Sequence, residues 1–193
     1  MSESQGRAGG TRYQRSSGGL VGALLVTVLA VIAFVLFRGF IRDDAPTPVR
    51  AVDYMTAVKA ARADQQLLVL APDRLPLGWK MTSATYTDGP SPTWHLGALT
   101  ADTKYVGVEE ARTSIEDLVE EHVDAAAQQG KDVAIGGETW QTWTDAGGDY
   151  AVARSLAAGG GRTESVLVVG TAPEQQIRDY AGTLRGGPVP AAG

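Results

Sequence analysis

The chain has 193 residues, of which 44% are hydrophobic and 20% are charged, and this composition excludes an intrinsically disordered or fibrous protein. It contains no cysteine, which excludes disulfides, thiolate metal sites and a cysteine nucleophile. Five arginines against Glu3 give residues 1–42 a charge of +4, which leaves −9 for the rest of a chain whose net charge is −5. An acidic domain is repelled by phosphate backbones, so we expect no nucleic-acid partner.

Residues 18–37 form an uncharged run of 20 residues, GGLVGALLVTVLAVIAFVLF. A helix of this length spans about 30 Å, which is the thickness of the hydrocarbon core of a bilayer. A cleavable signal peptide would have a shorter apolar region and a cleavage site of small residues, and the following RGFIRDDAP offers no such site. We therefore predict an uncleaved transmembrane helix, with the lipid bilayer as a partner.

Arginines flank this run unequally. Three precede it and two follow it, and the side with more basic residues is usually cytoplasmic. We expect residues 1–17 in the cytoplasm and the remainder outside, which makes this a single-pass protein of the cell membrane. Residues 38–50 then form a tether, residues 51–185 an extracytoplasmic domain, and residues 186–193 a flexible tail.

The first half of the domain is predicted to contain two helices with strands between them. A helix starts near Asp53, and a buried run after it ends in the turn Pro76-Leu-Gly78. Alternation of apolar and polar residues predicts strands over 79–87, 93–99 and 104–110. Thr113-Ser-Ile-Glu116 matches a capping box and Gly130 is a stop signal, so we expect a helix between them.

The second half repeats this order of strands followed by a helix. Strands are predicted over 131–135, 138–144, 149–156 and 163–169. Gly136-Gly137 between the first two is a hairpin turn that needs positive φ. Thr171-Ala-Pro-Glu174 matches a second capping box and opens the last helix.

These elements predict an α+β fold in which one N-terminal transmembrane helix precedes an antiparallel sheet of about six to seven strands. Two or three helices pack with the sheet, and we expect them on one face. The order strand, strand, strand, helix occurs over 79–129 and again over 131–185, which raises the hypothesis of two related units.

Two histidines are the first candidates for chemistry. In an alternating strand Trp94, Leu96 and Ala98 face the core and His95 faces the other side. A general base needs a partner within hydrogen-bond reach, and the sequence around His95 supplies none. His122 has no second histidine four residues further on, so we expect no metal and no cofactor.

A turn and a tryptophan pair are the next candidates. TDAGGD, which contains Asp145 and Asp149, is too short for a calcium loop and is interpreted as a hairpin turn. Trp140 and Trp143 are three residues apart on one strand and therefore face opposite sides. One of them is expected to be exposed, where it could bind a glycan, a peptide or the membrane interface, unless both faces are covered.

Several motifs together resemble one protein family. They are RYQRSSGGLVGALLVTVLAVIAF, LPLGW, WHLGALT, YVGVEEA, DLVEEHV and LVVGTAP, which extend from about Arg12 to Leu184. The chain resembles actinobacterial single-pass membrane proteins whose exported domain has unknown function and carries the family number 4245. The resemblance implies a membrane location and assigns no activity or catalytic residue.

The leading hypothesis is a non-enzymatic envelope protein whose domain binds a partner protein or a small envelope ligand. Candidate interaction residues are His95, Trp140 and Trp143. The alternative is an envelope hydrolase or transferase that uses two converging carboxylates. The acidic residues considered for that role are Asp145, Asp149, Glu109 and Glu110. A structural accessory subunit is a third hypothesis.

Overall fold

The computed structural model describes residues 50–158 and 161–187. The predicted cytoplasmic segment, the transmembrane helix, nearly all of the tether and most of the tail therefore lie outside the described residues. Within the described residues, no helix has the length and apolar character needed to cross a membrane.

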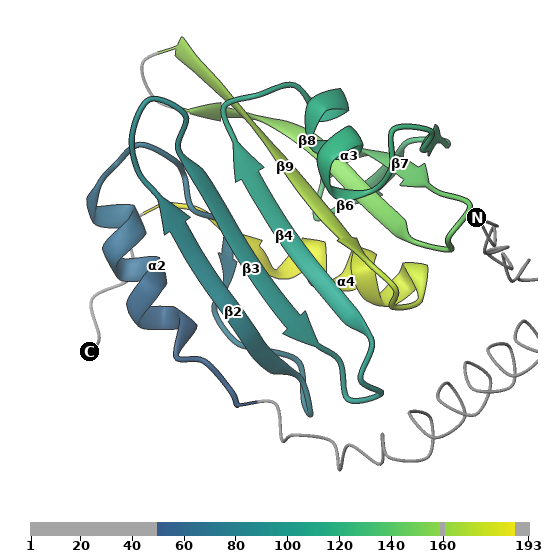
Figure 1. The fold of residues 1–193 in the computed structure, drawn as a ribbon, viewed down its shortest axis with the longest axis horizontal. Coiled ribbons are helices and arrows are strands. Elements are labelled where there is room, and N and C mark those ends of the chain that lie inside the picture. The colour runs from purple at the N-terminus through teal and green to yellow at the C-terminus, as the bar shows by residue number, and fades with distance from the viewer. Residues whose placement is uncertain (1–49, 159–160, 188–193) are drawn as a thin grey trace, which may run out of the picture. The chain divides into compact units, whose positions relative to one another are not determined.

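The described part is an α+β fold built on an antiparallel sheet (Figure 1). Its helices are α2 (Tyr54–Ala63), α3 (Ile115–His122) and α4 (Glu174–Thr183). The main sheet has eight strands, which are β2 (Lys80–Thr87), β3 (Thr93–Leu99), β4 (Tyr105–Ala111), β5 (Gln128–Gln129), β6 (Val133–Ile135), β7 (Glu138–Thr144), β8 (Tyr150–Ala158) and β9 (Arg162–Gly170). A separate pair is formed by β1 (Ala71–Pro72) and β10 (Leu184–Arg185).

Strand order places the two halves of the chain side by side. The order is β2-β3-β4-β9-β8-β7-β5, with β6 also paired to β7. Each half thus contributes a run of hairpins, and the antiparallel pairing of β4 with β9 joins them at the centre. The predicted strands agree with the observed ones to within about two residues.

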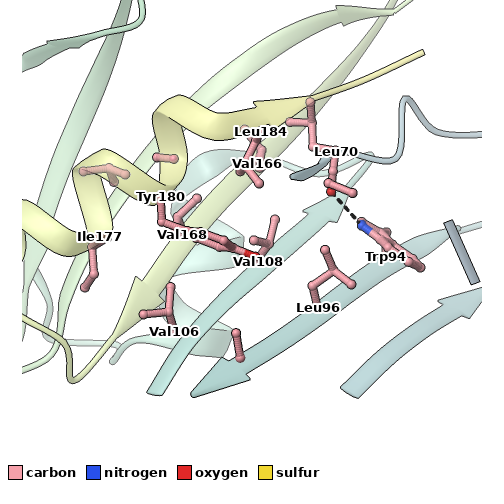
Figure 2. Packing of buried hydrophobic residues seen from close by; sticks show 14 of the residues in the cluster. Leu70, Trp94, Leu96, Val106, Val108, Val166, Val168, Ile177, Tyr180 and Leu184 are labelled. Carbon is pink, nitrogen blue, oxygen red and sulfur yellow. Dashed lines mark hydrogen bonds between the residues drawn. The ribbon is translucent and has the colours of Figure 1, made fainter. Parts of the chain in front are cut away.

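The sheet separates two hydrophobic clusters. The larger one contains alternate residues of the central strands under α2 and α4, such as Val106, Val108 and Val168 (Figure 2). Trp94 is fully buried there, and its indole N–H donates to the Leu70 carbonyl at 2.9 Å. The prediction that Trp94, Leu96 and Ala98 face the core is confirmed, because all three are 0% exposed.

The smaller cluster lies on the opposite face under α3. Ile115, Leu118 and Val119 of the helix pack on small and branched residues of β8 and β9, including Ala151 and Ala153. The expectation that all helices share one face is therefore wrong. Both faces of β8 are apolar over its first four residues, so each face needs a cover.

Helix α3 differs from its prediction at both ends. Its N-cap is Ser114 rather than Thr113, since the Ser114 hydroxyl accepts from the Asp117 amide and the Asp117 carboxylate accepts from the Ser114 amide. The helix ends at His122 and not near Gly130. Residues beyond it pair with the sheet instead, where Gly130 N–H donates to the Thr142 carbonyl at 2.8 Å.

The second predicted capping box is also wrong. Helix α4 has Pro173 as its N-cap and no side-chain cap. The Thr171 hydroxyl instead accepts from the Tyr105 amide at 3.1 Å, which ties the end of β9 to the start of β4. The glycine hairpin is confirmed, with φ of 62° at Gly136 and 86° at Gly137.

The loop after α2 is held by buried carboxyl groups. Glu110 accepts from the amides of Val69 and Leu70 at 2.9 and 2.7 Å, and Glu164 accepts from the amide of Leu68 at 3.0 Å. Both glutamates are 1% exposed. Burial, and to a lesser extent Glu164, raises the pKa of Glu110 to about 7 against the lowering effect of the two amides.

Arg62 closes the same region from the helix side. Its guanidinium donates to the Val69 carbonyl at 2.9 and 3.0 Å and to the Arg185 carbonyl at 2.6 Å. The beginning and the end of the domain are therefore joined through one side chain.

Candidate functional site: a groove lined by two histidines

A groove lies on the α3 face of the sheet, where β2, β3 and β4 are not covered by the smaller cluster. Its volume is about 750 Å³, which is in the range of small-molecule sites. The lining consists mainly of hydroxyl, imidazole and carboxylate side chains. It includes Thr85, Ser91, Thr93, His95, Tyr105, Glu109, Arg112, Thr113, Asp117, Glu121 and His122. We call it the histidine groove.

A β-bulge in β2 sets which side chains face this groove. Register shifts between Met81 and Ser83, so that Met81 pairs with Ala98 and Ser83 with Gly97. The extra residue, Thr82, donates its hydroxyl to the Gly97 carbonyl at 3.0 Å. The bulge keeps Met81 in the core while it brings Ser83 onto the groove face beside β3.

His95 stands between two side chains from the neighbouring strands. Its Nδ1 lies 2.6 Å from Glu109 Oε1 on β4, and its Nε2 lies 2.8 Å from Ser83 Oγ on β2. The His95 side chain is 32% exposed and that of Glu109 is 10% exposed. His95 thus lies on the face that alternation predicts, but the expectation that it lacks a hydrogen-bonding partner is wrong.

The second histidine reaches the same carboxylate from α3. His122 Nε2 lies 4.0 Å from Glu109 Oε2 and 3.9 Å from Glu121 Oε2. The fold therefore brings both histidines of the chain to Glu109. Within the described ranges, no group of three or more histidine and acidic side chains is arranged to hold a metal ion.

The charge states of the groove follow from these contacts. The hydrogen bond that His95 donates to Glu109 raises the pKa of His95, burial opposes this, and the charge of Glu109 raises it further. Burial, together with the charge of Glu109, raises the pKa of Tyr105. The Tyr105 hydroxyl therefore keeps its proton at physiological pH and can act as a donor.

Two glycines form the floor beside His95. Gly97 and Gly107 are direct cross-strand partners. A Cβ at Gly97 would lie 2.4 Å from Ser83 Oγ, and a Cβ at Gly107 would lie 2.6 Å from the Tyr105 hydroxyl oxygen. Only glycine leaves room for these two hydroxyl groups to lie against the sheet.

The four acidic residues considered for paired-carboxylate catalysis do not converge in this groove. Glu109 and Glu110 are adjacent on β4 and point to opposite faces, one to His95 and the other to the loop after α2. Asp145 accepts from the Asp149 amide at 2.7 Å and closes the hairpin between β7 and β8, which confirms the predicted turn.

The two candidate tryptophans lie outside the groove. Trp140 is 3% exposed in the larger cluster, with the Arg154 guanidinium 5.2 Å from its ring centroid. Trp143 is half-buried against the smaller cluster. They face opposite sides as predicted, and of the three candidate interaction residues only His95 lines the groove.

The signal that could have located the site is strand register. A hairpin that pairs 93–99 with 105–111 places Glu109 opposite His95, because paired residues must sum to a constant. Ser83 could not be placed in this way, because the bulge shifts its register.

The groove and the sheet around it define an α+β domain with a polar groove on one face of its sheet. The chain belongs to the DUF4245 family, described as proteins of unknown function, whose model matches residues 12–184. No curated protein matches the chain.

Two solved structures resemble part of the fold. One is a crystal structure of MucB in complex with MucA(peri), with 17% identity and a TM-score of 0.38 over 61% of this chain and 36% of that chain. The other is the MucA/MucB complex of Pseudomonas aeruginosa, with 15% identity and a TM-score of 0.37 over 61% of this chain and 34% of that one. The chain thus spans about a third of their length, and a likeness of this degree carries no argument about function.

Proposed function

We propose that this protein is a single-pass membrane protein whose extracytoplasmic domain binds a small polar envelope ligand in the histidine groove. The anchor is supported by the uncharged run of 20 residues at 18–37. The observation that carries the binding proposal is the groove of about 750 Å³ with its polar lining.

The lining favours a ligand that donates hydrogen bonds. Four acidic residues line the groove together with one guanidinium, that of Arg112. The Glu110 carboxylate turns to the loop after α2, which leaves the carboxylates of Glu109, Asp117 and Glu121. That guanidinium already donates to the Gln66 carbonyl. Three carboxylates against one guanidinium leave the groove with more acidic than basic groups, even though Arg112 Nε has no hydrogen-bond partner among the described residues. The ligand that we propose therefore carries hydroxyl and amino groups rather than phosphate or carboxylate groups.

A sugar amine tests this proposal. Glucosamine is titrated into the full-length protein in detergent micelles, and the ring resonances of the two histidines are followed by NMR. We expect saturable shifts of both histidines, and a weaker affinity in Glu121→Gln, where an exposed acceptor loses its charge. Glu138→Gln, an exposed position outside the groove, is the matched control. Acetate should cause no shift.

The opposite outcome would be informative. If neither histidine responds to glucosamine and the same protein is folded by circular dichroism, the groove is not a site for hydroxyl- and amine-bearing molecules. A response to acetate instead would reverse the charge argument.

A further inference from the structure

Ser83, His95 and Glu109 form a continuous hydrogen-bonded chain across three strands. The hydroxyl contacts imidazole Nε2 at 2.8 Å, and the carboxylate contacts Nδ1 at 2.6 Å. This is the order of atoms found in nucleophile, base and carboxylate triads, which recur on unrelated folds and are recognised by geometry. We propose that Ser83 is an activated nucleophile and that the histidine groove removes acyl groups from O-acylated, hydroxyl-bearing molecules.

This inference rests on the proposed function, because the groove must admit the molecule whose acyl group is transferred. His95 lines the groove and joins it to Ser83. The bulge in β2 is the feature that turns the Ser83 hydroxyl toward the base, and bulges are frequent next to active sites for this reason.

Within the Ser83-His95-Glu109 series, the base is more exposed than the carboxylate that orients it, as this chemistry requires. The base is 32% exposed, while the carboxylate that orients it is 10% exposed. A sheltered carboxylate fixes the tautomer of the imidazole that carries its proton on Nδ1, which leaves Nε2 free to take the serine proton. The raised pKa of His95 reflects the same contact and makes the ring a stronger base.

The reaction balances with water as the only co-reactant. Ser83 Oγ forms a bond to the acyl carbon, the bond from that carbon to the alcohol oxygen breaks, and His95 Nε2 carries the serine proton to the departing alcohol. Water then attacks the acyl-serine, loses a proton to His95, and releases the carboxylic acid while the proton returns to Ser83.

Tyr105 is the donor that we assign to the acyl oxygen. Its hydroxyl lies over Gly107 and its ring lies over Gly97, the glycine against which the Ser83 hydroxyl rests. A donor at this position can stabilise the negative charge that develops on the acyl oxygen.

A phosphonofluoridate probe, which modifies activated serines covalently, tests the proposal on the full-length protein in detergent micelles. We expect one adduct by intact-protein mass spectrometry, mapped to Ser83 and absent in Ser83→Ala. His95→Ala should slow labelling by at least about 100-fold. Ser155→Ala, which removes an exposed serine of β8 outside the groove, should label at the unchanged rate. Tyr105→Phe should slow hydrolysis of p-nitrophenyl acetate by about 100-fold.

Two results would overturn the proposal. One is the absence of a Ser83 adduct on protein that is folded by circular dichroism, and the other is equal labelling of His95→Ala. Glucosamine titration separates this failure from that of the binding proposal, because Ser83→Ala should still give histidine shifts. Shifts without an adduct reject the nucleophile alone, and an adduct without shifts rejects the ligand class alone.

Discussion

Glu109 determines how His95 titrates, because it supplies both a hydrogen bond and a charge. Glu109→Gln keeps an oxygen that can accept from the ring but removes the charge. We expect the pKa of His95 to fall, since burial then acts with less opposition. NMR titration of the two histidines measures this change, and His122→Ala assigns the resonances. An unchanged pKa would mean that Glu109 does not control the ring.

The same contact affects stability with a definite sign. The folded-state pKa of His95 lies above that of a free histidine, so the pair stabilises the fold below the unfolded pKa. This contribution is lost as pH rises through the folded pKa. Glu109→Gln should therefore lower the Tm more at about pH 5.5 than at about pH 8.5.

The Ser83 hydroxyl can lie against β3 because Gly97 has no side chain. Gly97→Ala would put a Cβ 2.4 Å from Ser83 Oγ and 3.3 Å from His95 Nε2. We expect a loss of about 1–3 kcal/mol in the free energy of unfolding, measured with denaturant. Part of this loss should disappear in the Ser83→Ala, Gly97→Ala double variant, because the hydroxyl that clashes is then absent. Strict additivity would contradict the close approach.

At the scale of the element, α3 tests which residues cap a helix. Ser114 and Asp117 exchange hydrogen bonds, and Thr113 also donates to Asp117 at 2.6 Å. Asp117→Ala should lower the free energy of unfolding, because the Ser114 amide and the Thr113 hydroxyl lose their acceptor. Glu116→Ala, which removes the carboxylate that the sequence pattern favoured, should lower it much less. Chemical denaturation compares the two variants. A larger loss of unfolding free energy for Glu116→Ala would indicate Thr113, and not Ser114, as the N-cap.

Strands with a clear alternation of apolar and polar residues could be predicted from the sequence. Segments that could join either a helix or the sheet could not. Alternation places β2, β3 and β4, since a one-residue error would turn every apolar side chain to the wrong face. β8 and β9 are instead apolar on both faces, and the turn signals around them mark their bounds. The end of α3 is different, because a stop signal comes only at Gly130, and residues 128–130 gain sheet partners only from β7. A single sequence does not contain that pairing.

The hypothesis of two related units meets a similar limit. β2-β3-β4-α3 and β7-β8-β9-α4 have the same order, and β4 and β9 are antiparallel neighbours. A two-fold axis between those strands would leave both helices on one face, whereas α3 and α4 pack on opposite faces. The face on which a helix packs depends on which side of each strand is apolar. β8 is apolar on both sides over Tyr150–Ala153, so its sequence does not select one face.

At the scale of the whole molecule, the buried carboxyl pair makes stability depend on pH. The pKa of Glu110 is about 7 in the fold against a usual value of 4.5, so the fold loses stability as pH rises between these values. Glu110→Gln imitates the protonated acid. The variant also loses some stability at every pH, because the glutamine amide nitrogen cannot accept a hydrogen bond from a backbone amide. The Tm difference, variant minus wild type, should therefore become more favourable from about pH 5 to about pH 8.

The control for this experiment is Glu120→Gln, an exposed position on α3. Its Tm difference should be nearly constant over the same range. A constant difference for Glu110→Gln as well would show that the carboxyl pair does not hold a proton in the fold.

The candidate site depends on the whole fold, which is why the sequence predicted so little of it. Its residues come from three strands and one helix, and Glu109 joins both histidines only because α3 follows β4 directly onto that face. The interpretation of Trp94 as a core residue needed only alternation. To predict the partners of His95, one would need the strand register, the bulge in β2 and the position of α3 together.

Topology across the membrane is the remaining prediction at this scale. If the arginine distribution orients the anchor as expected, external protease added to intact spheroplasts should digest a C-terminal tag. A tag placed at the N-terminus should resist digestion until the membrane is opened with detergent. Protection of the C-terminal tag would reverse the orientation and move the domain to the cytoplasm.

If the domain is held by one end, as the proposed membrane anchor requires, Arg62 has a mechanical consequence. Tension applied at residue 50 is first borne by the bond from Val52 N–H to the Met81 carbonyl, and then by α2. The guanidinium passes that load to Val69 and Arg185, so the two ends of the domain resist extension together. Arg62→Met should let α2 peel away at a lower pulling force in single-molecule experiments, while the sheet between β2 and β9 still ruptures as one unit.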